Sequence, residues 1–223
     1  MDPIQIFLLS TSPDLDVVVE LIKRFRPNLT PTIISNRIDW EKHRKSIKGR
    51  VILLSYDNGI IIPEQILDGL DFPAYNFHPA PPEYPGRDPY HFAIFDSAST
   101  YGATLHKMTE KVDDGTIVDV ERFDISHGSR PGGLLREARD RMLVMFKRHG
   151  DKLLSGSTLT ALEEKWASNK TTRADFLKMC RIPNDINNVE FERRFNAFDG
   201  ENHNNLVVEI HGRRFRIEKE SLV

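Results

Sequence analysis

Residues 4–25 read IQIFLLSTSPDLDVVVELIKRF, and the change of pattern within them indicates the class of fold. The apolar run at residues 4–9 is typical of a buried β-strand, and the polar residues that follow it predict a loop. Apolar side chains then recur at helical spacing, at Leu15, Val18, Val19 and Ile22. The stretch therefore predicts a strand, a loop and an amphipathic helix, in that order.

The same alternation continues along the chain. Further strands are expected at residues 32–35, 51–54, 74–77, 103–108 and 117–123, and helices at residues 40–47, 63–70, 90–95 and 133–149. This order predicts an α/β fold: a Rossmann-like open sheet, parallel at least in its first half, with helices on both faces. Ligands of such sheets bind at the carboxyl ends of the strands, so we expect the chemistry in the loops there.

The C-terminal part has a different pattern. Residues 156–171 read as a polar connector, residues 172–181 and 189–198 as short helices, and residues 206–217 as two strands around a tight turn at His211-Gly212. We therefore expect a main domain at residues 1–155 and a small C-terminal α+β extension at residues 156–223, packed on the main domain or on a partner subunit.

Composition excludes several classes of function. The formal net charge of -2 gives no basic field that would recruit nucleic acid. The single cysteine, Cys180, cannot form an internal disulfide or a Cys-rich zinc site, and the histidines lack zinc-site spacing, so no metal is expected. No stretch approaches the ~18 apolar residues that span a bilayer, and no signal peptide is recognisable, so we expect a cytoplasmic protein without membrane contact.

Asn76 and His78 are the first candidates for chemistry. They lie two residues apart at the end of an expected strand, so their side chains point to the same side. Four prolines within residues 79–87 stiffen the loop that follows and can hold an amide and an imidazole at a fixed separation. The alternative, in which Asn76 caps a turn and His78 is a buried hydrogen-bonded residue, stays open on this segment alone.

Two other segments also follow strands. Residues 113–115 read Asp-Asp-Gly and join two expected strands, which alone is typical of a hairpin connection. Residues 55–62 leave a strand at Ser55 and end in three isoleucines before a helix, and at least one of those isoleucines is expected in the core.

Together these segments resemble the formyltransferase family that uses 10-formyltetrahydrofolate. The family's Asn-x-His-Pro element is similar to residues 76–79, its Gly-x-Thr-x-His element to residues 102–106, and its Asp-x-Gly element to residues 113–115, in the same order. The loop after the His-Pro pair departs from the family, because Ala80-Pro81-Pro82-Glu83 stands where Ser-Leu-Leu-Pro is common. That departure concerns the acceptor pocket rather than the three matched elements.

The resemblance implies a catalytic set and a folate pocket. Asn76 would donate to the oxyanion of a tetrahedral intermediate, His78 would give electrophilic and acid support, and Asp113 would orient the histidine and help to transfer protons. Thr104 and His106 would be supports, although a structural histidine is the simpler interpretation. The pocket for 10-formyltetrahydrofolate, the implied co-substrate, would include Ser55, Tyr56, Gly59, Ile60, Lys111 and Asp114.

The acceptor is predicted by comparison within the family. The C-terminal part is short for a methionyl-tRNA formyltransferase, and residues 10–14 lack the glycine-rich phosphate loop of glycinamide ribonucleotide formyltransferases. The sequence is most similar to the sugar N-formyltransferases, which implies a nucleotide-linked amino sugar as acceptor and a homodimer through residues 206–217. Formyl transfer to methionyl-tRNA, glycinamide ribonucleotide or an amino-acid derivative, hydrolysis of 10-formyltetrahydrofolate, and a non-enzymatic nucleotide-binding module remain alternatives.

Overall fold

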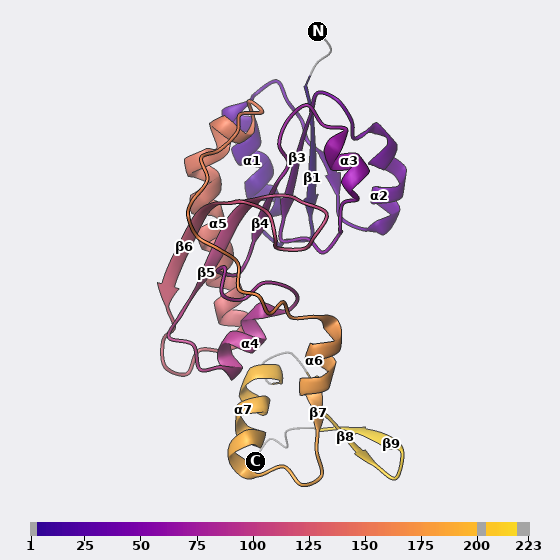
Figure 1. The fold of residues 1–223 in the computed structure, drawn as a ribbon, viewed down its shortest axis with the longest axis vertical. Helices are drawn as coiled ribbons and strands as arrows, with labels where there is room; N and C mark the ends of the chain where they lie inside the picture. Colours follow the sequence, from indigo (N-terminus) through magenta and orange to yellow (C-terminus); the bar gives the residue numbers. More distant parts are fainter. Residues whose placement is uncertain (1–3, 200–203, 218–223) are drawn as a thin grey trace.

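The computed structural model describes residues 4–199 and 204–217 (Figure 1). Its main sheet consists of β1 (Gln5–Ser10), β2 (Thr32–Ile34), β3 (Val51–Tyr56), β4 (Tyr75–His78), β5 (Thr100–Lys107) and β6 (Ile117–Asp124). The strand order is β2-β1-β3-β4-β5-β6. Neighbouring strands from β2 to β4 are parallel, and β5 pairs antiparallel with both β4 and β6. The predicted α/β sheet, parallel in its first half, is therefore confirmed.

Helices cover both faces of this sheet. They are α1 (Leu15–Phe25), α2 (Arg37–His43), α3 (Glu64–Asp68), α4 (Pro89–Phe95) and α5 (Pro131–Leu153), and a short 3-10 helix (Arg44–Ser46) follows α2. Figure 1 shows α1 and α5 on one side of the sheet and α2 and α3 on the other. Among the helices of the described residues, none is both long and apolar enough to cross a membrane.

The continuous apolar runs of the central strands follow from this double covering. In β1, Ile6 and Leu8 pack in the cluster that contains α1 and α5, whereas Phe7 and Leu9 pack in the cluster that contains Trp40 of α2. Strand side chains alternate between the faces, so a strand that is buried on both faces needs apolar residues at every position. Residues 6–9, Ile-Phe-Leu-Leu, meet this need.

The sheet places several loops at one edge. Because β1, β3 and β4 are parallel, their carboxyl ends, near Ser10, Tyr56 and His78, lie at the same edge. Asp57, directly after β3, has a left-handed backbone with φ of 49°, which turns the chain sharply out of the strand. The antiparallel β5 then runs back from this edge, and its connection to β6 returns there.

The C-terminal elements are α6 (Arg173–Cys180), β7 (Arg181–Ile182), α7 (Asn188–Phe198), β8 (Val207–Ile210) and β9 (Arg213–Arg216). The two expected helices and the expected hairpin are confirmed, whereas β7, which pairs with β8, has only two residues and was not predicted. Phe198 of α7 packs against Phe92 and Phe95 of α4, which attaches these elements to the sheet (Figure 1).

Candidate active site

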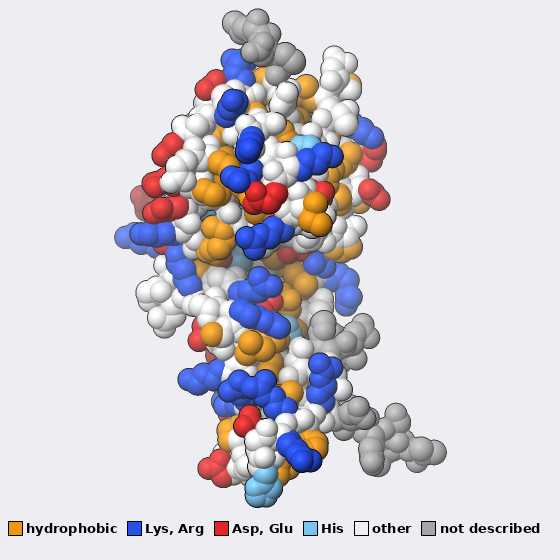
Figure 2. All heavy atoms as spheres, turned by 90° about the vertical axis from the view of Figure 1, so that its right-hand side faces the viewer, with side chains coloured by type: hydrophobic (Ala, Val, Ile, Leu, Met, Phe, Trp, Pro, Cys, Tyr) orange, Lys and Arg blue, Asp and Glu red, His pale blue; other side chains and the backbone are white. Residues whose placement is uncertain are grey.

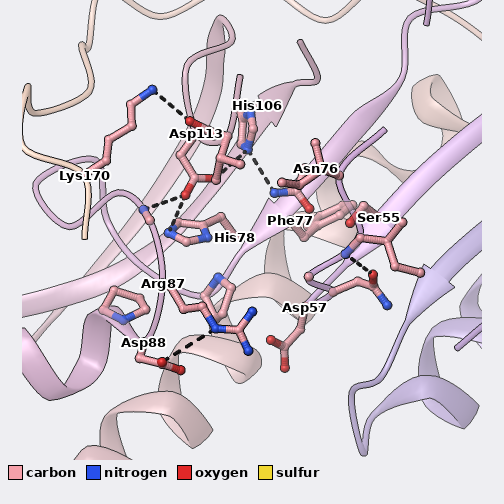
Figure 3. A pocket seen from close by; sticks show the side chains of 18 of the residues that line it. Ser55, Asp57, Asn76, Phe77, His78, Arg87, Asp88, His106, Asp113 and Lys170 are labelled. Carbon is pink, nitrogen blue, oxygen red and sulfur yellow. Dashed lines mark hydrogen bonds and ion pairs between the residues drawn. The ribbon is translucent and has the colours of Figure 1, made fainter. Parts of the chain in front are cut away.

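A cavity of about 590 Å³ lies at the carboxyl edge of the parallel strands. Its walls come from the loops after β1, β3 and β4, from the connection between β5 and β6, and from residues 170–173. Figure 3 shows polar side chains from these separate segments directed toward one another in this cavity. The cavity therefore lies at the ends of the strands, where ligands of open α/β sheets commonly bind.

Strand pairing brings Asn76 next to His106. The antiparallel register of β4 and β5 puts these two residues directly opposite each other. Their side chains meet, with 3.0 Å between Asn76 Nδ2 and His106 Nε2. His78, two residues along β4, projects on the same side as Asn76, as the alternation predicts. His106 is buried and directly contacts a side chain of the predicted catalytic set.

Asp113 completes the cluster from a distant part of the chain. One of its carboxylate oxygens lies 3.6 Å from His78 Nε2, and the other lies 3.6 Å from His106 Nε2 (Figure 3). The Gly86 N–H donates to the same carboxylate at 2.7 Å. Asp113 itself has a left-handed backbone with φ of 43°. A single carboxylate therefore faces two imidazoles at the wall of the cavity.

The surroundings of Asp113 favour its ionised form. Burial is the largest influence on its pKa and raises it, because only 4% of the residue is exposed. His78, His106 and the Gly86 amide act in the opposite direction, and together they lower the pKa of Asp113 to about 2. The site thus holds a buried carboxylate that stays negative at neutral pH.

This lowered pKa predicts how stability depends on pH. A carboxyl whose folded pKa is about 2, against 3.8 ordinarily, stabilises the fold above about pH 4 and loses that contribution as pH falls toward 2. We expect Asp113→Asn to lower the free energy of unfolding by about 2 kcal/mol near neutral pH, and by progressively less between pH 4 and 2. Urea titrations of both proteins across this range measure the difference, and a difference that does not change with pH would contradict the account.

Trp166 is a site residue that the sequence analysis missed. Its Nε1 donates to the Gly115 carbonyl at 2.8 Å, and its ring stands edge-on to His106 and His78 at centroid distances of 5.0 and 5.9 Å. It lies in residues 156–171, which we expected to be only a connector. A tryptophan within a polar segment was the available signal, since so large a ring seldom stays in water.

The same segment joins two loops of the cavity. Thr171 exchanges backbone hydrogen bonds with the proline-rich loop, donating to Pro85 and accepting from Arg87. Gly86 permits this approach: it has φ of 102°, and a Cβ there would lie 2.2 Å from the Thr171 carbonyl oxygen. On the other side, Lys170 Nζ donates to Val112 O at 2.8 Å. Residues 166–171 thereby support both loops that hold the cluster.

The residues predicted for the folate pocket divide into two groups. Four of them line the cavity: Ser55, Gly59, Ile60 and Lys111. Tyr56 does not, because it is the next residue after Ser55 on β3 and its fully buried side chain packs on Phe77 in the core. Asp114 is exposed and pairs with Lys170 at 2.7 Å, so Asp113 alone of the two acids enters the cluster.

The isoleucine triplet also divides. Ile60, Ile61 and Ile62 all contribute to the wall of the cavity. Ile62 is only 2% exposed and belongs to the core, whereas Ile61 is 61% exposed. The expectation that at least one of the three is a core residue is confirmed. The exposed Ile61 leaves an apolar surface at the cavity that a flat aromatic ring can cover.

Cationic side chains surround the mouth of the cavity. Arg87 and Arg173 line it and are largely exposed, and both approach the carboxylate of Asp88, at 3.7 and 3.4 Å. Deeper in the cavity, Arg139 of α5 pairs with Asp57 at 2.7 Å. Figure 2 shows Lys and Arg side chains spread over one whole face of the molecule. The exposed arginines can therefore meet an anionic ligand.

The cluster suits transfer of an acyl group. An amide that donates, two imidazoles and a buried carboxylate can together stabilise an oxyanion and move protons. Residues 42–142 match the family model of the formyl transferases.

Individual relatives are distant or match only in part. Over 80 residues the chain is 35% identical to methionyl-tRNA formyltransferase of Natranaerobius thermophilus. This matched segment makes up 35% of this chain and 26% of the length of that protein. A solved sugar N-formyltransferase from a Shewanella species superposes with a TM-score of 0.76 and 17% identity, over 99% of this chain and 98% of that chain. The N-formyltransferase of Helicobacter canadensis was solved in complex with folinic acid and dTDP-3-aminofucose. It superposes with a TM-score of 0.72 and 16% identity, over 94% of this chain and 85% of that chain. These structural likenesses establish the shared fold.

Proposed function

We propose that this protein transfers a formyl group from 10-formyltetrahydrofolate to the amine of a nucleotide-linked amino sugar. The convergence of Asn76, His78, His106 and Asp113 at one wall of an open cavity is the observation that carries this proposal. The solved relative with folinic acid and a dTDP-linked amino sugar supports both substrates.

The proposed reaction forms one C–N bond and breaks another. The acceptor amine attacks the formyl carbon, and the carbonyl oxygen becomes an oxyanion that accepts a hydrogen bond from Asn76 Nδ2. His78, paired with the negative Asp113, adds positive charge nearby when it is protonated. The tetrahedral intermediate then collapses as the bond from carbon to the folate nitrogen breaks. The amine loses one proton and the folate nitrogen gains one, which gives a formamide and tetrahydrofolate.

The arginines at the mouth support a nucleotide-linked acceptor. A diphosphate needs cationic donors, and Arg87 and Arg173 are exposed there; both lie near the Asp88 carboxylate, and Arg173 also packs over the Phe176 ring. We infer that these guanidinium groups turn toward the diphosphate when the acceptor binds. Ile61, beside the predicted folate residues, gives the apolar surface that the pterin ring of the co-substrate requires.

Formyl transfer to methionyl-tRNA is the second candidate. The observation in its favour is the 35% identity to a methionyl-tRNA formyltransferase over 80 residues. The net charge of -2 opposes it, because binding to a tRNA backbone depends on clustered cations. The two candidates share the catalytic cluster and differ only in the acceptor.

Ligand binding tests the proposal one substrate at a time. Folinic acid, a formyl-folate that does not react, is expected to raise the melting temperature by roughly 5–10 °C at 100 times its dissociation constant. dTDP- and UDP-linked amino sugars are expected to add to this shift, and formylation of one of them is then read by mass spectrometry with 10-formyltetrahydrofolate. No shift with folinic acid would contradict the proposal, and transfer to methionyl-tRNA alone would favour the second candidate.

We also propose that residues 1–155 form the catalytic domain and that residues 156–223 form an extension that pairs with a second copy of the chain. The exposed Ile210 and Phe215 on the hairpin of β8 and β9 support such a contact. Since Trp166 and Thr171 contact the site, the catalytic domain would also depend on the first part of the extension. Sedimentation velocity measures the oligomeric state that this proposal requires.

A further inference from the structure

The turn that carries Asp113 is exposed, apart from Asp113 itself and Gly115. Residues 109–112 and 114 face solvent. Asp113 nevertheless points inward, with 4% of the residue exposed, and its φ of 43° is left-handed. A residue other than glycine keeps such a backbone only where its surroundings fix it. The position of Asp113 therefore depends on contacts that other parts of the chain make with this turn.

Lys170 makes such contacts on both sides of Asp113. Its Nζ donates to Val112 O at 2.8 Å and to Asp114 Oδ1 at 2.7 Å. Figure 3 shows the Lys170 side chain extended toward the turn. An ammonium group has three donors, so it can bind two acceptors at once. One side chain thus joins the residue before Asp113 to the residue after it.

Two neighbours of Lys170 add to this support. Trp166 Nε1 donates to the Gly115 carbonyl at 2.8 Å, at the end of the same turn. Thr171 pairs through its backbone with the loop of Gly86, whose N–H donates to the Asp113 carboxylate at 2.7 Å. The short segment 166–171 therefore contacts the turn at residues 112, 114 and 115, and it also fixes a donor that meets the carboxylate.

We propose that Lys170 is a positioning residue for Asp113: by joining the residues on either side of it, the ammonium group holds the carboxylate against the two histidines. This role rests on the proposed function, in which Asp113 takes part in formyl transfer. The effect passes through the backbone, because the bonds of Lys170 go to the neighbours of Asp113. A displacement of about 1 Å among reacting groups can lower a rate about 100-fold. Lys170 also lines the cavity, so direct contact with a ligand is the competing interpretation.

Variants of Lys170 separate positioning from ligand binding. Lys170→Met removes the ammonium group and keeps an aliphatic chain, and we expect kcat to fall about 10–100-fold while both KM values change less than about threefold. Lys170→Arg, whose guanidinium can donate to both acceptors, should restore part of the rate. Lys23→Met is the matched control and should keep its kcat, because Lys23 pairs with Glu20 at 3.0 Å outside the cavity lining. A raised KM with unchanged kcat in Lys170→Met would overturn the proposal.

A double-mutant cycle tests whether Lys170 acts through Asp113. In Asp113→Asn the carboxylate is already gone, so adding Lys170→Met should lower the single-turnover rate less than about threefold. Circular dichroism at the assay temperature verifies that each variant is folded. If the two losses simply multiply, Lys170 acts independently of Asp113 and the proposal is wrong.

Crystal structures of the wild type and of Lys170→Met test the claim without any turnover. The distances from the Asp113 carboxylate to His78 and His106, both 3.6 Å in the wild type, are expected to lengthen by about 1 Å in the variant. An unmoved carboxylate would overturn the proposal. Absence of formyl transfer by the wild-type protein would refute the proposed function instead, and the two crystal structures would still decide the role of Lys170.

Discussion

Replacement of Asn76 by alanine is expected to lower kcat by about 10²–10³, which is the usual effect of removing one oxyanion donor. The amide is held by a hydrogen bond from Nδ2 to His106 and lines the cavity, so it is in place before substrate arrives. Alanine leaves β4 intact and removes only the donor. The KM values for the folate and the acceptor should change little, because the interaction develops with the oxyanion rather than with the ground state.

A matched control comes from Asn205, whose Nδ2 donates to the Phe198 carbonyl at 2.9 Å in the C-terminal elements. Asn205→Ala loses a hydrogen bond of the same kind and should keep its kcat. Single-turnover rates with 10-formyltetrahydrofolate separate the chemical step from product release. If Asn76→Ala keeps a rate within about threefold of the wild type while remaining folded, its assignment as oxyanion donor is wrong.

Replacement of Gly115 by alanine is expected to destabilise the protein by about 3 kcal/mol and to lower the melting temperature by roughly 6–12 °C. A Cβ at this position would lie 1.7 Å from the Lys107 carbonyl oxygen, so the backbone between β5 and β6 has to move. Asp113 is two residues away in that connection, and Trp166 donates to the Gly115 carbonyl. We therefore expect activity to fall together with stability.

Gly133, in the first turn of α5, is the control for this substitution. A Cβ there meets no atom within 4 Å, and alanine has a higher helix propensity than glycine, so Gly133→Ala should be neutral or stabilise by up to about 1 kcal/mol. Thermal melting followed by circular dichroism compares the two variants. Equal melting temperatures for Gly115→Ala and the wild type would mean that the close approach to Lys107 does not constrain the fold.

The sheet was predictable because burial on both faces leaves a clear record in the sequence. Continuous apolar runs such as residues 4–9 and 51–54 mark strands that are covered on both sides, and helical spacing marks α1 between them. The predicted ends of the helices and strands were less accurate. The strand β7 was missed, since two residues cannot display an alternation.

The candidate site was predictable only in part. Alternation along β4 correctly placed Asn76 and His78 on one side, but the contact of Asn76 with His106 depends on the antiparallel register of β4 and β5, which local sequence does not encode. Asp113 reaches the cluster through a left-handed turn and a hydrogen bond from Gly86 in another loop. Such long-range closure follows from tertiary packing rather than from local preference.

Trp166 and Tyr56 show the two kinds of error. Trp166 was overlooked because its segment has neither helical nor strand periodicity, although its ring contacts both histidines. The family resemblance places Tyr56 in the folate pocket, but the alternation of side chains on β3 directs its side chain into the core against Phe77. A strict use of that alternation would have excluded its side chain from the cavity.

A crystal structure of the protein soaked with folinic acid tests the central claim most directly. We predict that the folate occupies the cavity beside Ile60 and Ile61, with its formyl group within hydrogen-bonding reach of Asn76 Nδ2 and next to His78. A folate bound elsewhere, or one whose formyl group lies far from Asn76, His78 and Asp113, would contradict the assignment of this cluster to formyl transfer.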